Sequence, residues 1–99
     1  MPAALMVAYP AGDGAHFDRD YYVATHLPLV RRAFASQGLT DVAGYFPDAS
    51  GDLLAVAILT FTDAARRDSA LASAEAAPVF ADIANFTTAS PIPMPMTVA

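Results

Sequence analysis

The residues best suited to chemistry lie between Phe17 and Leu29, where a histidine follows a tyrosine by one helical turn. On a helix at about 100° per residue, Tyr22, His26 and Leu29 share one apolar face. An imidazole can serve as a general acid or base because its ordinary pKa lies near neutrality. Burying it without a hydrogen-bond partner costs about 1–3 kcal/mol. His26 is therefore either a satisfied core histidine or a functional group that faces a polar pocket.

The helix that carries His26 is predicted to begin after Asp18, an N-cap acceptor, and to end before Gly38. Pro28 removes a backbone donor, so a kink is expected after His26. The projection divides the remaining residues between two faces. The apolar face collects Tyr22, Val23, His26, Leu27, Leu29, Val30, Ala33 and Phe34, and the opposite face collects Tyr21, Ala24, Thr25, Pro28, Arg31 and Arg32.

The rest of the chain predicts strands before and after this helix. Strands are expected over residues 4–9, 39–46 and 53–61, a helix over 64–73 with a continuation over 75–84, and a last strand over 91–96. In that last segment the prolines alternate with apolar residues, which suits an edge strand, with a polyproline-like tail as the competing interpretation. The order β-α-β-β-α-β predicts an α+β fold of the ferredoxin-like type, with an antiparallel sheet and helices on one face.

The strand over residues 53–61 is apolar in both phases, whereas a half-exposed antiparallel strand would alternate with polar residues. Both faces of the sheet must then be covered, and the helices can cover only one. A second copy of the chain is the simplest cover for the other face, so the sequence predicts a homodimer.

Composition limits the partners. The 99 residues suit a single domain, residues 1–99, and carry a net charge of −5 with only five basic residues. Such a surface argues against nucleic acids and acidic membranes as partners.

The chain has no cysteine and no apolar run of membrane-spanning length or signal peptide, so a cytoplasmic protein is expected. Several acidic residues and His16 crowd residues 13–20, but their spacing matches no metal motif, and no metal site is predicted.

Several blocks together resemble the EthD family, which is named for a protein associated with ethyl tert-butyl ether degradation. They are the Phe-Asp-x-x-Tyr-Tyr-x-x-x-His-Leu-Pro-Leu block of residues 17–29, the Val-Ala-Tyr-Pro that closes the first strand, and the Ala-Asp-Ile-Ala-Asn-Phe-Thr of residues 81–87. The resemblance spans essentially the whole chain and is closest to short members labelled EthD family reductases. It implies a dimeric α+β barrel, in which two ferredoxin-like protomers pack sheet against sheet and each holds a cavity between sheet and helices.

The resemblance places His26 in that cavity as the candidate catalytic residue. Tyr22, Tyr9, Asp82 and Asn85 are the candidate ligand-binding residues, and an Asp or Asn on one ring nitrogen would set the tautomer of His26. No cofactor is predicted. Three functions remain open: a cofactor-independent oxygenase, isomerase or lyase acting on a small phenolic or apolar molecule, a non-catalytic carrier of such a molecule, and a structural dimer with a filled core.

Overall fold

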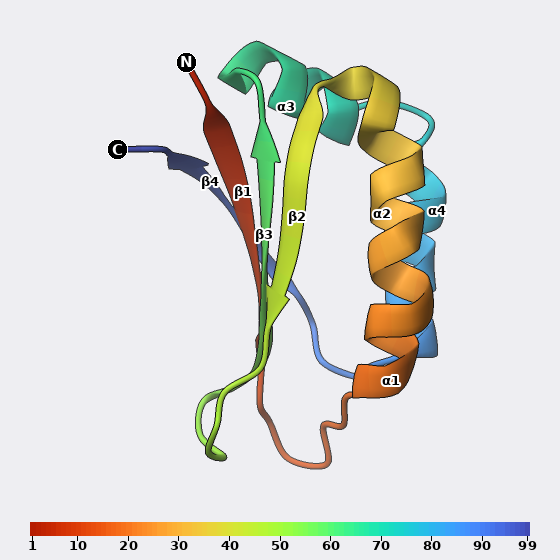
Figure 1. The fold of residues 1–99 in the computed structure, drawn as a ribbon. Coiled ribbons are helices and arrows are strands. Elements are labelled where there is room, and N and C mark those ends of the chain that lie inside the picture. Colours follow the sequence, from red (N-terminus) through yellow and green to blue (C-terminus); the bar gives the residue numbers. More distant parts are fainter.

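The computed structural model describes residues 1–99 and has the predicted order of elements. The four strands are β1 (Ala3–Pro10), β2 (Leu39–Tyr45), β3 (Leu53–Phe61) and β4 (Ile92–Thr97). They form one antiparallel sheet in the order β2-β3-β1-β4, and every helix lies on the same face of it (Figure 1). This arrangement confirms the ferredoxin-like α+β fold of the protomer.

The first helical region is composite. It consists of α1 (Arg19–Tyr21), a π-helical turn η1 (Tyr22–His26), α2 (Leu27–Phe34) and a 3-10 turn η2 (Ala35–Gln37). The side chain of Asp18 caps it by accepting a hydrogen bond from the Tyr21 backbone N–H at 3.0 Å. Gly38, with a left-handed φ of 88°, ends it as the sequence predicts.

The predicted kink after His26 is instead a π-helical turn that ends at His26. The Leu27 N–H reaches back five residues to the Tyr22 carbonyl, so the backbone widens just before Pro28, which has no N–H to offer the preceding turn. A regular helical projection therefore misplaces residues at the start of the helix. Val23, assigned to the apolar face, is 54% exposed, whereas Tyr21, assigned to the opposite face, contacts Asp82.

The second helical region comprises α3 (Ala64–Leu71), α4 (Ala76–Asp82) and a 3-10 turn η3 (Ile83–Asn85). Asp63 caps α3 by accepting from the Arg66 backbone N–H at 2.8 Å. The turns between α3 and α4 let the chain run back along the sheet beside α2 (Figure 1), and α2 and α4 are in contact. Residues near the end of α4 thus lie beside the start of the first helical region.

The core fills the space between the sheet and the helices. Odd-numbered residues of β1 and β3 point to the helices, and the largest fully buried side chains are Tyr9, Tyr22, Phe34, Phe61 and Phe86. Gly44 of β2 permits one of the closest approaches, because a Cβ there would lie 3.0 Å from a ring carbon of Tyr22. Tyr22, which precedes His26 by one turn, therefore packs directly against the backbone of β2.

The terminal prolines belong to an edge strand. β4 pairs with β1, with Pro93 opposite Val7 and Pro95 opposite Leu5. The alternating residues Ile92, Met94 and Met96 supply the backbone donors, so the free edge of β4 lacks N–H groups at both prolines. The polyproline-like tail is therefore excluded, and the edge strand is confirmed.

The middle of the sheet face away from the helices is apolar, and no element of this chain covers it. Two adjacent rows of side chains cross all four strands, as the pairing register shows. We call these eight residues the outer apolar face: Ile92, Ala8, Val56 and Tyr45 in one row, and Met94, Met6, Ile58 and Ala43 in the other.

None of the helices combines the length and apolarity needed to cross a membrane.

Candidate functional site

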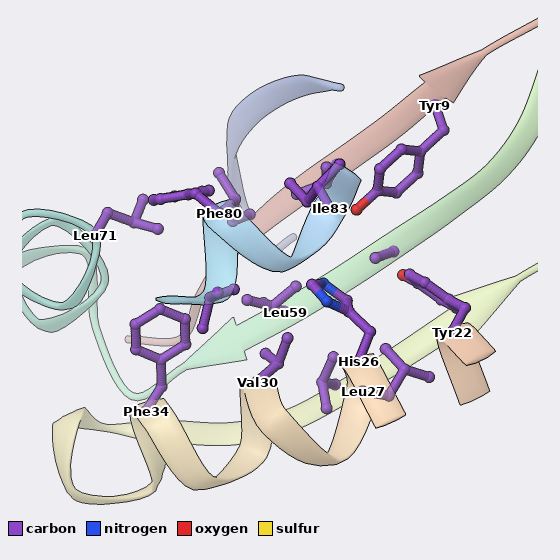
Figure 2. Close-up of a pocket in the computed structure, with 15 residues that line it drawn as sticks. Tyr9, Tyr22, His26, Leu27, Val30, Phe34, Leu59, Leu71, Phe80 and Ile83 are labelled. Atoms are coloured by element: carbon purple, nitrogen blue, oxygen red, sulfur yellow. The ribbon is translucent and has the colours of Figure 1, made fainter. Parts of the chain in front are cut away.

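A small cavity of about 30 Å³ lies between the sheet and the helices (Figure 2). Of its fifteen lining residues, His26 is the single one not classed as hydrophobic. The lining comes from β1, β2, β3 and both helical regions: Leu5, Val7, Tyr9, Tyr22, His26, Leu27, Val30, Phe34, Val42, Ala57, Leu59, Leu71, Val79, Phe80 and Ile83. Apart from the imidazole of His26 and the hydroxyls of Tyr9 and Tyr22, the lining is therefore apolar.

His26 is held from behind by a carboxylate. Its Nδ1 lies 2.9 Å from Oδ2 of Asp82, at the end of α4, and only 3% of the histidine is exposed. The other carboxylate oxygen, Oδ1, accepts from the Tyr21 hydroxyl at 2.6 Å and from the Asn85 side-chain amide at 3.0 Å. Asp82 is therefore the centre of a hydrogen-bonded group of four side chains from α1, η1, α4 and η3.

The environment favours an ionised Asp82 and an uncharged His26. Burial would raise the pKa of Asp82, but hydrogen bonds from Tyr21, Asn85 and His26 together lower it below its usual value. Burial lowers the pKa of His26, and the bond and charge of Asp82 offset only part of that effect. At neutral pH the pair is a carboxylate facing a neutral imidazole, not an ion pair.

The ionised state of Asp82 fixes the tautomer of His26. An ionised carboxylate can only accept a hydrogen bond, so the Nδ1 of His26 must carry the proton and donate it to Oδ2. Its Nε2 is then left with a free lone pair. The sequence predicted that an acidic or amide side chain would serve this purpose, and Asp82 is the residue in contact.

Two tyrosine hydroxyls accompany the imidazole. In Figure 2 the hydroxyl oxygens of Tyr9 and Tyr22 point toward the end of the cavity where the His26 ring lies. The Tyr22 and His26 rings stack with centroids 5.4 Å apart. Burial raises the pKa of Tyr22 to about 12, and burial together with neighbouring Tyr22 raises the pKa of Tyr9 further. Both phenols stay protonated at neutral pH and can donate.

The five residues singled out from the sequence lie together, in two roles. Tyr9, Tyr22 and His26 line the cavity, whereas Asp82 stands behind His26 and the exposed Asn85 contacts Asp82. The sequence reasoning missed Tyr21, which the regular helical projection placed away from this site. Two features of the sequence indicated that this helix departs from a regular projection: Tyr21 directly precedes Tyr22, and a proline follows at position 28.

The geometry supports proton transfer more than metal chemistry. A neutral imidazole with a free Nε2 can accept a proton, and two neutral phenols can donate to an oxygen that gains negative charge. No group of three or more histidine, aspartate, glutamate or cysteine side chains lies close enough together to hold a metal ion.

The comparisons with known proteins found similar solved structures. No family model and no curated protein matches the sequence. An EthD-like protein from Ralstonia eutropha JMP134 is 26% identical, with a TM-score of 0.82 over 99% of this chain and 92% of that one. The resemblance to the EthD family is thereby confirmed in three dimensions and over nearly the whole chain.

Two more distant structures share the fold. SnoaB, a cofactor-independent oxygenase from Streptomyces nogalater, is 14% identical, with a TM-score of 0.68 over 99% of this chain and 95% of its own. A dimeric ferredoxin-like protein of unknown function from Jannaschia sp. CCS1 is 16% identical, with a TM-score of 0.68 over 99% and 100% of the two chains. At these identities the likeness concerns the fold alone.

Proposed function

We propose that this protein is a cofactor-independent enzyme that moves a proton on a small phenolic or otherwise largely apolar molecule, with His26 as the proton-transfer group. The observation that carries the proposal is the bond from His26 Nδ1 to Asp82 Oδ2, which leaves Nε2 as the only basic atom at an apolar cavity. A histidine that serves only the core also needs a hydrogen-bond partner for one ring nitrogen. Such a role would not require its second nitrogen to lie at a cavity.

The reaction starts with removal of a proton from an acidic C–H or O–H of the ligand by Nε2. The resulting imidazolium is stabilised by Asp82, which remains a carboxylate. The ligand oxygen that gains charge receives hydrogen bonds from the hydroxyls of Tyr9 and Tyr22. These steps need only side chains of this chain and no cofactor. SnoaB, which has the same fold, is described as a cofactor-independent oxygenase.

Access to His26 requires a wall of the cavity to move. A volume of about 30 Å³ has room for one or two water molecules and not for a phenol. Phe80 and Ile83, labelled in Figure 2, line this cavity. They also line an outer groove of about 570 Å³ next to the segment that leads into β4. Phe80 is 47% exposed and therefore weakly held, so we assign the movable wall to it.

The proposal is tested by proton exchange. The protein is incubated in D₂O with a panel of phenols, enolisable ketones, quinones and lactones, and deuterium uptake and product formation are followed by NMR and mass spectrometry. Exchange above the buffer rate that saturates with ligand supports an enzyme. Exchange at the buffer rate for every compound overturns it.

A second function, a carrier, is favoured by the apolar lining, which offers hydrophobic contact and few polar anchors. A carrier would bind panel members without accelerating exchange. A structural dimer with a filled core, the third possibility, would neither bind nor exchange, and the small volume of the cavity is the observation in its favour.

Phe80→Ala should enlarge the site. Removing the ring joins the cavity to the outer groove, so binding of 2-naphthol, a bulky phenol, should tighten by about tenfold while phenol itself gains less. Isothermal titration calorimetry measures both affinities. Val23→Ala, which shortens another half-exposed apolar side chain outside the cavity, is the matched control. Equal affinity of wild type and Phe80→Ala for 2-naphthol would show that Phe80 is not the wall.

We also propose that the protein is a homodimer in which two outer apolar faces meet. The eight residues of that face are apolar on all four strands, and exposed patches of this kind mark protein contacts. The proline-bearing edge of β4 lacks donors, which disfavours association by extension of the sheet and leaves the face as the surface of contact. The Jannaschia protein of the same fold is described as dimeric.

A further inference from the structure

The two oxygens of Asp82 have separate partners. Oδ2 faces only His26 Nδ1, whereas Oδ1 accepts from the Tyr21 hydroxyl at 2.6 Å and from the Asn85 amide at 3.0 Å. No arginine pairs with this carboxylate, so the neutral donors on Oδ1 are what orient it. A carboxylate with one free oxygen could rotate about its χ2 angle and lose its alignment with the imidazole.

We infer that Tyr21 is a positioning residue for His26: its hydroxyl, with the Asn85 amide, holds Asp82 Oδ1 so that Oδ2 aligns with Nδ1 and Nε2 faces the cavity. The inference rests on the proposed role of His26 in proton transfer. Tyr21 itself does not line the cavity, so it acts through Asp82 and not on the ligand.

Tyr21 also tunes the basicity of the imidazole. A short O–H···O⁻ bond withdraws negative charge from the carboxylate, which weakens the pull of Asp82 on the His26 proton. The hydrogen bond to Asp82 in turn raises the pKa of Tyr21, so its hydroxyl stays protonated and keeps donating. The result is a base that remains neutral, and hence able to accept a proton, near physiological pH.

Few other groups can contribute to this titration. The titratable groups that face His26 are Asp82 from α4, Tyr22 from the preceding turn of its own helix and Tyr9 from β1. Burial keeps both tyrosines neutral, and Phe86, which packs against the ring with centroids 4.6 Å apart, carries no charge. Changes in the His26 titration therefore report on Asp82 and on what binds it.

A purely structural role for Tyr21 is the competing explanation, because its bond ties α1 to α4 and its ring stacks on Phe86 with centroids 6.3 Å apart. The two explanations differ in what Tyr21→Phe changes. A tie between helices affects stability. A positioning residue affects the pKa and the tautomer of His26 in the folded protein.

The experiment is an NMR titration of the two histidines in the absence of ligand, so its result does not depend on finding a substrate. In Tyr21→Phe the midpoint of His26 should shift upward, since Asp82 regains charge while the Asn85 amide still holds its Oδ1. In the double variant Tyr21→Phe/Asn85→Ala, where Oδ1 has lost both donors, the Nδ1–H tautomer should lose population as the carboxylate loosens. Asp82→Asn should shift the same midpoint downward, because the favourable charge is gone. Exposed His16 in each sample is the internal reference. Tyr45→Phe, on the opposite face of the sheet, is the matched control.

An unchanged His26 midpoint in folded Tyr21→Phe, or an unchanged tautomer in the folded double variant, would overturn the inference, even if the wild-type protein proves to be an enzyme. If Tyr21→Phe does not fold, Asn85→Ala removes the second donor to Oδ1 from an exposed position and should shift the midpoint in the same upward direction. No shift in that variant overturns the inference as well. The two proposals can fail separately. If His26→Phe loses exchange activity but the His26 titration does not shift in these variants, the proposed function is supported and the role of Tyr21 is overturned.

Discussion

His26→Phe should give a folded protein that no longer accelerates proton exchange. Phenylalanine keeps a flat ring for stacking on Tyr22 and removes both nitrogens, so the exchange rate should fall by about 10²–10⁴-fold, the contribution expected of a positioned general base. The free energy of unfolding should change by less than about 2 kcal/mol, because Asp82 keeps its bonds to Tyr21 and Asn85. Deuterium uptake and chemical denaturation measure the two quantities.

The pH dependence of stability gives a second readout for the same variant. The folded-state pKa of His26 lies below its ordinary value of 6.5, so the unfolded chain binds the proton more readily. Wild-type stability should therefore fall as the pH drops below about 6.5 towards the folded-state pKa. In His26→Phe this loss should disappear, while the loss caused by protonation of Asp82 at lower pH should remain.

The other histidine provides the control. His16→Phe removes an exposed imidazole outside the cavity and should leave exchange unchanged. If His26→Phe retains full exchange while folded, His26 is a core residue and the proposed function is wrong. If it binds ligands as the wild type does and neither protein exchanges, the protein is a carrier whose recognition does not use the imidazole.

The sequence was sufficient to predict the architecture because the relevant signals are local. Capping by Asp18 and Asp63 and the left-handed Gly38 mark the helix boundaries, and the two apolar phases of residues 53–61 mark a strand with two apolar faces, of which the helices of this chain cover one. His26 could be recognised because a polar ring stands out on an apolar helix face. These features depend on neighbours in the chain and need no knowledge of tertiary contacts.

The details of the site could not be predicted in the same way. The contacts of Asp82 with His26 and Tyr21 join residues 56 and 61 positions apart, so they follow from how α4 packs beside α1. The π-helical turn changes the register of the first helix, and a regular projection therefore placed Tyr21 and Val23 on the wrong faces. Phe80 lines the cavity, and its sequence position gives no indication of where its ring lies.

Val56→Asp should convert the protein from a dimer to a folded monomer. Val56 is a central member of the outer apolar face, with Ala8 and Tyr45 as its cross-strand neighbours, and the alternation along β3 points it away from the helix-side core. A stable pairing of such faces would bury about 1,200–2,000 Å² in total. A carboxylate at its centre would be desolvated in both copies without a partner, which such an interface does not tolerate. Light scattering at micromolar concentration measures the mass.

The same substitution tests the orientation of the strand. Because Ala57 and Leu59 face the cavity and Val56 does not, the monomer should keep the circular dichroism spectrum of the wild type and unfold cooperatively. Ser50→Asp adds the same charge in the exposed loop between β2 and β3 and should leave the dimer intact, which separates a local effect from general charge repulsion. A wild-type protein that is monomeric, or a Val56→Asp variant that remains dimeric, would show that the outer apolar face is not where two copies meet. A variant that unfolds outright would mean that pairing of this face is required for the protomer to fold, because nothing on the helix side of the sheet has been changed.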